Sequence, residues 1–171
     1  MAKSILLKVI TAGEGGVGKT TLLYRYIEGK FLADTRMTIG VEFFLKEIKI
    51  GGKKILLQVW DFGGQDHFRP ILKNYAKGAR GALLLFDLTR ISSLQSIDQW
   101  VNICREENPD IPIIFLGTKL DLKDKINVDD SFALGFKEKF NFFEYLKISS
   151  KTGENVNKAF ELIATKLVEG L

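Results

Sequence analysis

The sequence predicts an α/β domain of three layers, in which a mostly parallel sheet of six strands is covered by helices on both faces. Short apolar runs alternate along the chain with segments that carry apolar residues at helical spacing. The runs at 82–87 (ALLLFD) and 111–117 (IPIIFLG) are almost continuously apolar, which is typical of strands buried on both faces of a parallel sheet. The 171 residues contain no internal repeat or linker-like tract, so we expect one domain spanning 1–171.

Each predicted element follows from its own pattern. Residues 4–12 (SILLKVITA) form an apolar run that ends in glycines and predicts a strand, and 20–28 (TTLLYRYIE) predicts a helix. Strands are expected at 42–50 and 55–61, because the four residues Gly51-Gly52-Lys53-Lys54 between them favour an antiparallel hairpin. This hairpin supplies the one antiparallel edge strand. The remaining predicted elements are strands at 82–87, 111–117 and 142–148 and helices at 92–107 and 156–167.

Composition excludes several classes of protein. The net charge is +4, from 25 Lys and Arg against 21 Asp and Glu, but the two signs alternate, as in 123–125 (KDK), without a basic stripe for nucleic acid. The single cysteine, Cys104, excludes an internal disulfide, and its place on the apolar stripe of a predicted helix indicates a buried thiol. No apolar run approaches the roughly 18 residues of a membrane span, and the N-terminus lacks a signal-peptide pattern. We expect a cytoplasmic monomer.

Residues 13–20 (GEGGVGKT) match the phosphate-loop pattern G-x-x-x-x-G-K-[ST]. The segment follows a predicted strand and opens a predicted helix, which is the context that this motif requires. Its glycines allow successive backbone N–H groups to approach a phosphate, and the helix N-terminus adds a favourable dipole. Lys19 is expected to bridge the terminal phosphates and the Thr20 hydroxyl to bind magnesium. The motif predicts a nucleoside triphosphate site, and it leaves a kinase, an ATPase and a GTPase as alternatives.

Two further segments favour guanine as the base. Residues 118–121 (TKLD) follow a buried strand, and the Asp121 carboxylate can accept hydrogen bonds from the N1–H and the amino group of guanine. Adenine has no proton on N1, and a site built around a hydrogen-bonded group discriminates strongly against a partner that lacks it. Ser149, Ser150 and Lys151 follow the next strand, where they can supply backbone donors to the guanine oxygen, and Lys151 can cover the ring.

Together these segments resemble a small GTPase of the Ras superfamily, most closely its Rab branch. The resemblance covers nearly the whole chain and rests on five motifs in order: GEGGVGKT, TIGVEF at 38–43, WDFGGQ at 60–65, GTKLD at 117–121 and SSKTGENV at 149–156. It implies the phosphate-loop NTPase fold, binding of GTP and GDP with Mg²⁺, GTP hydrolysis, and a switch between two nucleotide states. Two loops, at about 31–41 and 62–75, are expected to be ordered by the γ-phosphate.

The resemblance also implies a role for individual residues. Gln65 orients the attacking water and is placed with Lys19 and the Gly64 N–H in the catalytic set. Magnesium is held by Thr20 and Thr38 and, through a water, by Asp61, while Phe31 stacks on guanine. The implied nucleotide-binding set is Gly13, Gly15, Gly16, Val17, Gly18, Lys19, Thr20, Thr21, Phe31, Thr38, Gly64, Thr118, Lys119, Asp121, Leu122, Ser149, Ser150 and Lys151.

The chain departs from the family pattern in four places. Thr118 replaces the commoner asparagine, but the Rho branch also has TKLD, so guanine binding is expected to remain. Phe62-Gly63 replaces the usual Thr-Ala, and the segment then resembles the DVGGQ of the Arf branch. Its two consecutive glycines predict a more mobile segment. Ser150 stands where alanine is usual. The sequence ends at 169–171 without a cysteine for prenylation, which leaves a trimmed chain and a protein without a lipid anchor as alternatives.

Several side chains have two interpretations. Phe43, Trp60 and Tyr75 match the aromatic triad through which Rab proteins contact effectors, and the alternative is that all three are ordinary sheet or core residues. His67 is interpreted as a solvated loop residue and not as a proton shuttle. Arg36 lies near the position of the cis-acting arginine of some GTPases, although a solvent-facing side chain is the simpler interpretation.

The leading function is a GTP-hydrolysing switch with an exchange factor, an activating protein and an effector as partners. These partners are expected to contact the aromatic triad and the two switch loops. A GTP-bound scaffold with negligible turnover is the alternative, because the residues around Gln65 are altered. An ATP-using phosphotransferase is disfavoured by Asp121.

Overall fold

The computed structural model describes residues 3–32, 41–62 and 69–171, and at its centre is a six-stranded sheet in the order β2-β3-β1-β4-β5-β6. Strand β2 runs antiparallel to β3 at one edge of the sheet, and all other neighbouring strands are parallel. The predicted fold class is therefore confirmed. The strands are β1 (Ile5–Ala12), β2 (Val41–Ile50), β3 (Lys53–Phe62), β4 (Gly81–Asp87), β5 (Ile113–Thr118) and β6 (Glu144–Lys147).

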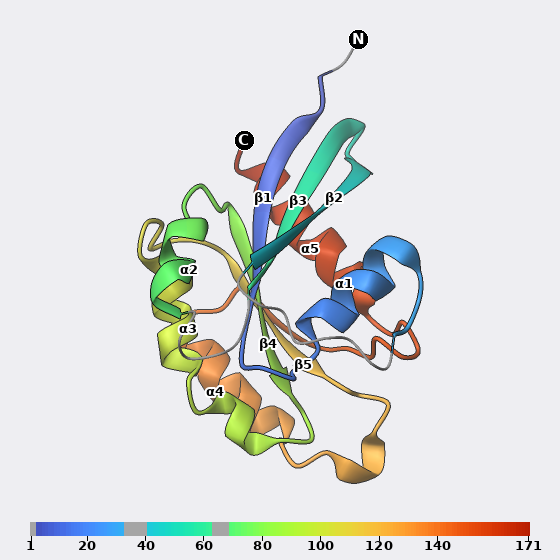
Figure 1. Cartoon of the computed structure of the whole chain (residues 1–171), viewed down its shortest axis with the longest axis vertical. Coiled ribbons are helices and arrows are strands. Elements are labelled where there is room, and N and C mark those ends of the chain that lie inside the picture. Colours follow the sequence, from blue (N-terminus) through green and yellow to red (C-terminus); the bar gives the residue numbers. More distant parts are fainter. Residues whose placement is uncertain (1–2, 33–40, 63–68) are drawn as a thin grey trace.

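Helices cover both faces of the sheet and complete the three layers (Figure 1). Helices α1 (Lys19–Glu28) and α5 (Val156–Glu169) share one apolar core with the sheet. The opposite core is formed with α2 (Arg69–Tyr75), α3 (Ile97–Arg105) and α4 (Asp130–Phe140). Strand β4 is buried along its whole length because it lies between the two cores, as its continuous apolar sequence predicts. Among the described helices, none is long and apolar enough to cross a membrane.

The predicted hairpin is present, but its connection is shorter than expected. Strand β3 begins at Lys53, so only Gly51 and Gly52 connect the two strands, and the predicted four-residue connection was wrong. Both glycines have positive φ, 56° and 78°, which is the conformation of the tight two-residue turn that matches the twist of paired strands. Lys53 and Lys54 pair with Ile50 and Lys49 instead of turning.

The single helix predicted at 92–107 is divided into two parts. A short 3₁₀ turn, η2 (Ile91–Leu94), precedes α3, which begins at Ile97. The Ser93 hydroxyl accepts from the Asp87 N–H (2.9 Å) and donates to the Arg90 carbonyl (2.7 Å), so it competes with regular helical hydrogen bonds. Cys104 on α3 is buried, as predicted, and burial raises the pKa of its thiol to about 12.

Sequence reasoning missed α2 and α4. The apolar side chains of α4 do not form one buried stripe, because Phe132 and Leu134 are exposed while Ala133 is buried. A cap at each end defines this helix: the Asp129 carboxylate accepts from the Phe132 N–H at 2.8 Å, and Asn141 is left-handed with φ 53°. A second 3₁₀ turn, η3 (Lys123–Lys125), precedes α4.

The parallel strands end at one edge of the sheet, the lower edge in Figure 1, and their loops meet there. The phosphate-loop motif lies between β1 and α1, the TKLD segment begins at the last residue of β5, and the SSKTG segment follows β6. In parallel sheets, ligands bind at this carboxyl edge. The fold therefore brings segments more than 100 residues apart to one place.

Candidate functional site

The carboxyl edge of the sheet is where the chain buries its polar side chains. In the described part of the chain, every buried polar or charged residue lies at the end of a strand or in the segment that follows it. Burying such groups is unfavourable unless they are hydrogen-bonded, so this concentration marks a functional edge. These residues are Thr11, Lys19, Asp61, Asp87, Ser93, Thr118 and Ser149.

The phosphate loop is closely packed against the sheet at its first residue. A Cβ atom on Gly13 would lie 2.4 Å from the Leu85 carbonyl oxygen on β4, and the φ of Gly13 is +141°. Only glycine fits this position without displacing backbone. Helix α1 then begins after Gly18 without a side-chain cap, so the N–H groups of its first turn are directed towards the loop.

Lys19 lies across the phosphate loop and is nearly fully buried. Its Nζ donates to the carbonyl oxygens of Gly13 (2.7 Å) and Glu14 (2.8 Å). These bonds hold an ammonium group beside the loop, where a phosphate would need a positive charge. The expected role of Lys19 in bridging the terminal phosphates remains a prediction.

Thr20 and Asp61, two residues of the predicted magnesium site, lie in direct contact. Thr20 Oγ1 donates to Asp61 Oδ2 at 2.6 Å, and Thr11 Oγ1 lies 3.4 Å from the other carboxylate oxygen. Asp61 is completely buried near the end of β3, so its orientation is fixed by packing. A hydroxyl and a carboxylate are the hard oxygen ligands that Mg²⁺ prefers, so the residues present fit this ion.

Two residues from the end of β5 hold the outer side of the phosphate loop. Thr118 Oγ1 lies 2.6 Å from the Val17 carbonyl oxygen and 3.1 Å from that of Phe86, and Lys119 Nζ donates to the Gly16 carbonyl at 3.3 Å. Because a hydroxyl has one proton, the shorter Val17 bond is the main one. Thr118, which stands where asparagine is commoner, still ties the loop to β5.

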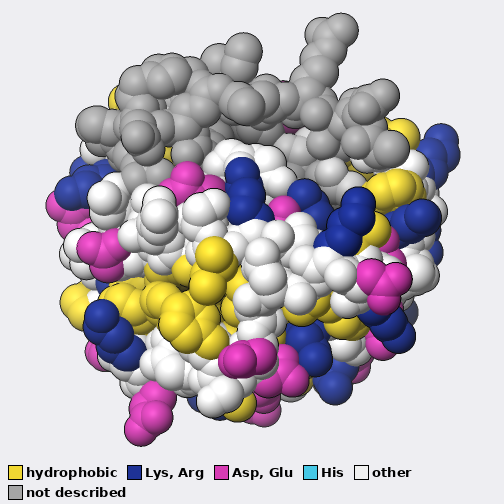
Figure 2. Space-filling model, turned by 90° about the horizontal axis from the view of Figure 1, so that it is seen from below, with side chains coloured by type: hydrophobic (Ala, Val, Ile, Leu, Met, Phe, Trp, Pro, Cys, Tyr) yellow, Lys and Arg dark blue, Asp and Glu magenta, His cyan; other side chains and the backbone are white. Residues whose placement is uncertain are grey.

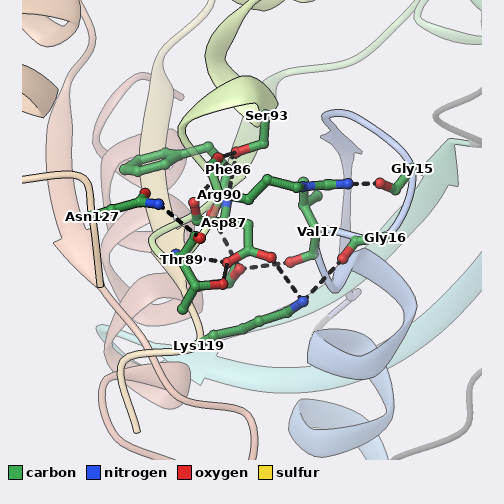
Figure 3. Close-up of polar contacts among 11 residues, drawn as sticks. Gly15, Gly16, Val17, Phe86, Asp87, Thr89, Arg90, Ser93, Lys119 and Asn127 are labelled. Carbon is green, nitrogen blue, oxygen red and sulfur yellow. Dashed lines mark hydrogen bonds and ion pairs between the residues drawn. The ribbon is translucent and has the colours of Figure 1, made fainter. Parts of the chain in front are cut away.

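Asp87 anchors Lys119 from the end of β4 (Figure 3). Lys119 Nζ lies 2.8 Å from Asp87 Oδ2, and Asp87 Oδ1 accepts from the Thr89 N–H (2.8 Å) and hydroxyl (2.6 Å). Burial raises the pKa of this carboxyl, but hydrogen bonds from Lys119 and Thr89, with the Lys119 charge, outweigh that effect. The pKa of Asp87 therefore lies below its ordinary value of 3.8.

Arg90 supplies a third contact to the loop. Its Nη2 donates to the Gly15 carbonyl at 2.8 Å, and its side chain approaches the loop from the turn that follows β4 (Figure 3). Sequence reasoning singled out neither Arg90 nor Asp87. The available signal was a polar DLTR segment, 87–90, directly after a wholly apolar strand at the edge where ligands bind.

Beside the loop lies a cavity of about 360 Å³. Asp121 is held beside it by Ser149, whose Oγ donates to Asp121 Oδ1 at 2.8 Å while accepting from the Thr152 N–H. Phe31 is 41% exposed at the cavity. The predicted site residues that line the cavity are Gly16, Val17, Gly18, Thr21, Phe31, Thr118, Lys119, Asp121, Leu122, Ser150 and Lys151. Seen from this edge in Figure 2, basic side chains are spread over the middle of the face.

Part of the predicted site cannot be placed, because the structure describes residues 3–32, 41–62 and 69–171. Thr38, Gly64 and Gln65 lie outside the described residues, as do Arg36 and His67. Their expected roles remain predictions.

The aromatic residues of the hairpin form a second cluster, on the face of the sheet that carries α2. Phe43 and Trp60 pair across β2 and β3 with ring centroids 5.4 Å apart, and Tyr75 at the end of α2 lies 5.9 Å from Trp60. Phe43 is 55% exposed and Tyr75 is 44% exposed, so these two are not core residues. Trp60 is half-buried, with Lys8 Nζ 4.4 Å from its ring centre.

The sheet order and the loop between β1 and α1 define a phosphate-loop nucleotide-binding fold. The sequence model of the Ras family matches residues 8–169, and the chain belongs to this family of small GTPases. Its relatives include the Ras-related protein Rab-4B of Homo sapiens, 40% identical over 91% of this chain and 73% of that protein. Rab-2B of Dictyostelium discoideum is 37% identical over 97% of this chain and 82% of its own length. Rab-4A of Bos taurus is 40% identical, over 95% and 75% respectively.

Proposed function

We propose that this chain binds GTP and GDP with Mg²⁺ at the carboxyl edge of the sheet and hydrolyses GTP slowly as a Rab-like switch. One observation carries the proposal: a phosphate loop held in place by side-chain hydrogen bonds lies beside the same cavity as the Asp121 carboxylate. Asp121, held by Ser149, lies beside a cavity whose wall includes Gly16, Gly18 and Lys119. Family membership supports the same function.

Each part of the edge would contribute one step of recognition. Backbone N–H groups of the loop and the Lys19 ammonium would bind the phosphates, and Asp121 would read the guanine edge. Thr20 and, through a water, Asp61 would hold Mg²⁺, which would neutralise charge on the phosphate oxygens. Of the undescribed residues, Thr38 would join the metal site, Gly64 would contact the γ-phosphate and Gln65 would orient the attacking water.

The hairpin connects the site to a surface where partners would bind. The undescribed segment 33–40 ends directly before β2, and segment 63–68 directly follows β3. A change in either loop on hydrolysis would therefore act on strands that carry Phe43 and Trp60. We propose that an effector docks on the exposed aromatic cluster and that exchange and activating proteins contact the same loops.

Base choice tests the proposal directly. Asp121→Asn is expected to weaken GTP binding at least tenfold and to improve binding of xanthosine triphosphate, because the amide can donate to the oxygen that replaces the guanine amino group. Asp124→Asn serves as the control, because the Asp124 carboxylate is exposed on η3. This substitution should change the affinity neither for GTP nor for xanthosine triphosphate. Equal affinity of the unmodified protein for ATP and GTP in competition would contradict the proposal.

A second experiment measures turnover: the protein is loaded with GTP, and hydrolysis is followed after Mg²⁺ is added. Domains of this design hydrolyse GTP at roughly 10⁻⁴ to 10⁻³ per second without a partner, and Gln65→Leu should slow this further while nucleotide affinity is kept. If GTP stays intact over many hours in the unmodified protein, the result would instead support the alternative function, a GTP-bound scaffold with negligible turnover.

A further inference from the structure

Arg90 contacts the phosphate loop, and the proposed function gives this residue no role. Its Nη2 lies 2.8 Å from the Gly15 carbonyl oxygen, and a Cβ on Gly16 would stand 3.8 Å from the same nitrogen. The guanidinium therefore covers the outer side of two consecutive residues of the loop. Figure 3 shows this side chain extending from the turn after β4 to the loop.

The turn that carries Arg90 is firmly held. The Arg90 N–H donates to the Asp87 carbonyl (3.0 Å), and the Arg90 carbonyl accepts from both the N–H (3.0 Å) and the hydroxyl (2.7 Å) of Ser93. Ser93 is buried, and Asn127 holds the neighbouring Thr89 carbonyl at 3.1 Å. The backbone from which the guanidinium projects is thus fixed on both sides, which favours one direction for the side chain.

The contact fixes the orientation of a peptide group. In a trans peptide, the C=O and the following N–H point in opposite directions. Because Arg90 holds the Gly15 oxygen, the Gly16 N–H is directed away from the guanidinium, where it can donate to a phosphate. Lys119 and Thr118 hold the next two carbonyls of the loop in the same way. The three contacts together fix the orientations of the Gly16, Val17 and Gly18 N–H groups, which are consecutive backbone donors of the kind that bind anions.

Arg90 differs from Lys119 in how it is anchored. Lys119 is paired with the buried Asp87 carboxylate, whereas the Arg90 side chain bonds, within the described part of the chain, to the Gly15 carbonyl. The Gly15–Gly16 peptide joins two glycines, whose backbones lose the most conformational freedom when they are ordered. A side chain that orders them in advance lowers the entropic cost of binding.

We propose that Arg90 is a positioning residue for the bound nucleotide: by holding the Gly15 carbonyl, it directs the Gly16 N–H to a phosphate and slows nucleotide release. This inference rests on the proposed function. Loss of one hydrogen bond to a charged donor at an exposed site predicts release about five to ten times faster.

The test measures release of a fluorescent GDP derivative from the loaded full chain, in excess unlabelled GDP and Mg²⁺. Arg90→Ala should release it about five to ten times faster, and Arg90→Lys, which keeps a charged donor, should restore at least half of the difference. Arg80→Ala is the matched control, because Arg80 is exposed at the opposite end of β4 and should leave the rate unchanged.

Two spectroscopic readouts separate positioning from a general effect of charge or stability. The Gly16 amide resonance and the phosphorus resonances of bound GDP should move in Arg90→Ala and stay in place in Arg80→Ala. Release within twofold of the unmodified rate would overturn the inference, as would faster release with all these resonances unmoved. If the unmodified protein retains no guanine nucleotide at all, the proposed function itself fails, which is a different result.

Discussion

The carboxyl edge of the sheet and the face of the β2–β3 hairpin that carries Phe43 differ in the side chains that they bury and expose. At the edge, buried polar groups bond to residues far away in sequence: Thr118 holds Val17, 101 positions earlier, and Thr20 bonds to Asp61. On the hairpin face, large apolar side chains are left exposed, with Phe43 at 55% and Leu45 at 51%. Their neighbours are those that strand register supplies.

This difference suggests how recognition is divided between the two regions. The edge fixes the directions of polar atoms before a small charged ligand arrives, which suits precise hydrogen bonding. The hairpin face offers apolar area with little built-in geometry, which suits a protein partner that brings its own shape. Substitutions of buried or closely packed residues at the edge should therefore lower stability strongly, and substitutions on the hairpin face should lower it little.

The largest effect is expected at the first residue of the phosphate loop. Gly13→Ala would place a Cβ 2.4 Å from the Leu85 carbonyl at a φ of +141°, so the free energy of unfolding should fall by about 3 kcal/mol. In Gly15→Ala the new Cβ would meet nothing within 4 Å, and the change should stay within about 0.5 kcal/mol. Urea unfolding in nucleotide-free buffer compares the two, because bound ligand would add its own stabilisation. Equal losses would show that the loop is not closely packed against β4.

A smaller loss is expected from the buried carboxylate that anchors Lys119. Asp87→Asn removes the charge that Lys119 and Thr89 stabilise, and stability at pH 7 should fall by about 2 kcal/mol. Asp124→Asn, exposed on η3, should change it by less than about 0.5 kcal/mol.

Acid should remove the same contribution. Because the pKa of Asp87 is lower in the folded protein than its ordinary 3.8, its stabilisation is complete well above 3.8 and is lost as the pH falls below that value. The stability difference between Asp87→Asn and the unmodified protein should therefore shrink from pH 6 to pH 3. A difference that stays constant over this range would contradict the assigned ion pair.

The smallest effect is expected on the hairpin face. Phe43→Ala removes one ring from contact with Trp60 and should lower stability by no more than about 1 kcal/mol. Leu57→Ala, on the adjacent β3 and completely buried, should lower it by about 3 kcal/mol. Thermal unfolding of the two variants makes the comparison. A larger loss in Phe43→Ala would mean that the aromatic cluster is a structural core and not a docking surface.

Much of this architecture could be predicted from sequence because it depends on local patterns. Continuous apolar runs identified the buried strands, and the glycines of 51–52 identified a hairpin, although not its length. The motif at 13–20 placed the phosphate loop between a strand and a helix. Helix α4 was not predicted, because its exposed Phe132 and Leu134 do not follow the helical spacing of a buried face.

The sequence by itself determined where most of the strands lie along the chain, which residues form the phosphate and base loops, and the family. Each of these depends on short runs of contiguous residues. Only the tertiary structure decided that Asp87 fixes Lys119, that Ser149 fixes Asp121, and that Arg90 reaches Gly15. The Ser149–Asp121 and Arg90–Gly15 hydrogen bonds join residues 28 and 75 positions apart. All three contacts depend on where the parallel strands end. A hydrogen bond requires a distance near 3 Å and a favourable angle, and no local pattern specifies either until packing of the sheet has brought the loops together.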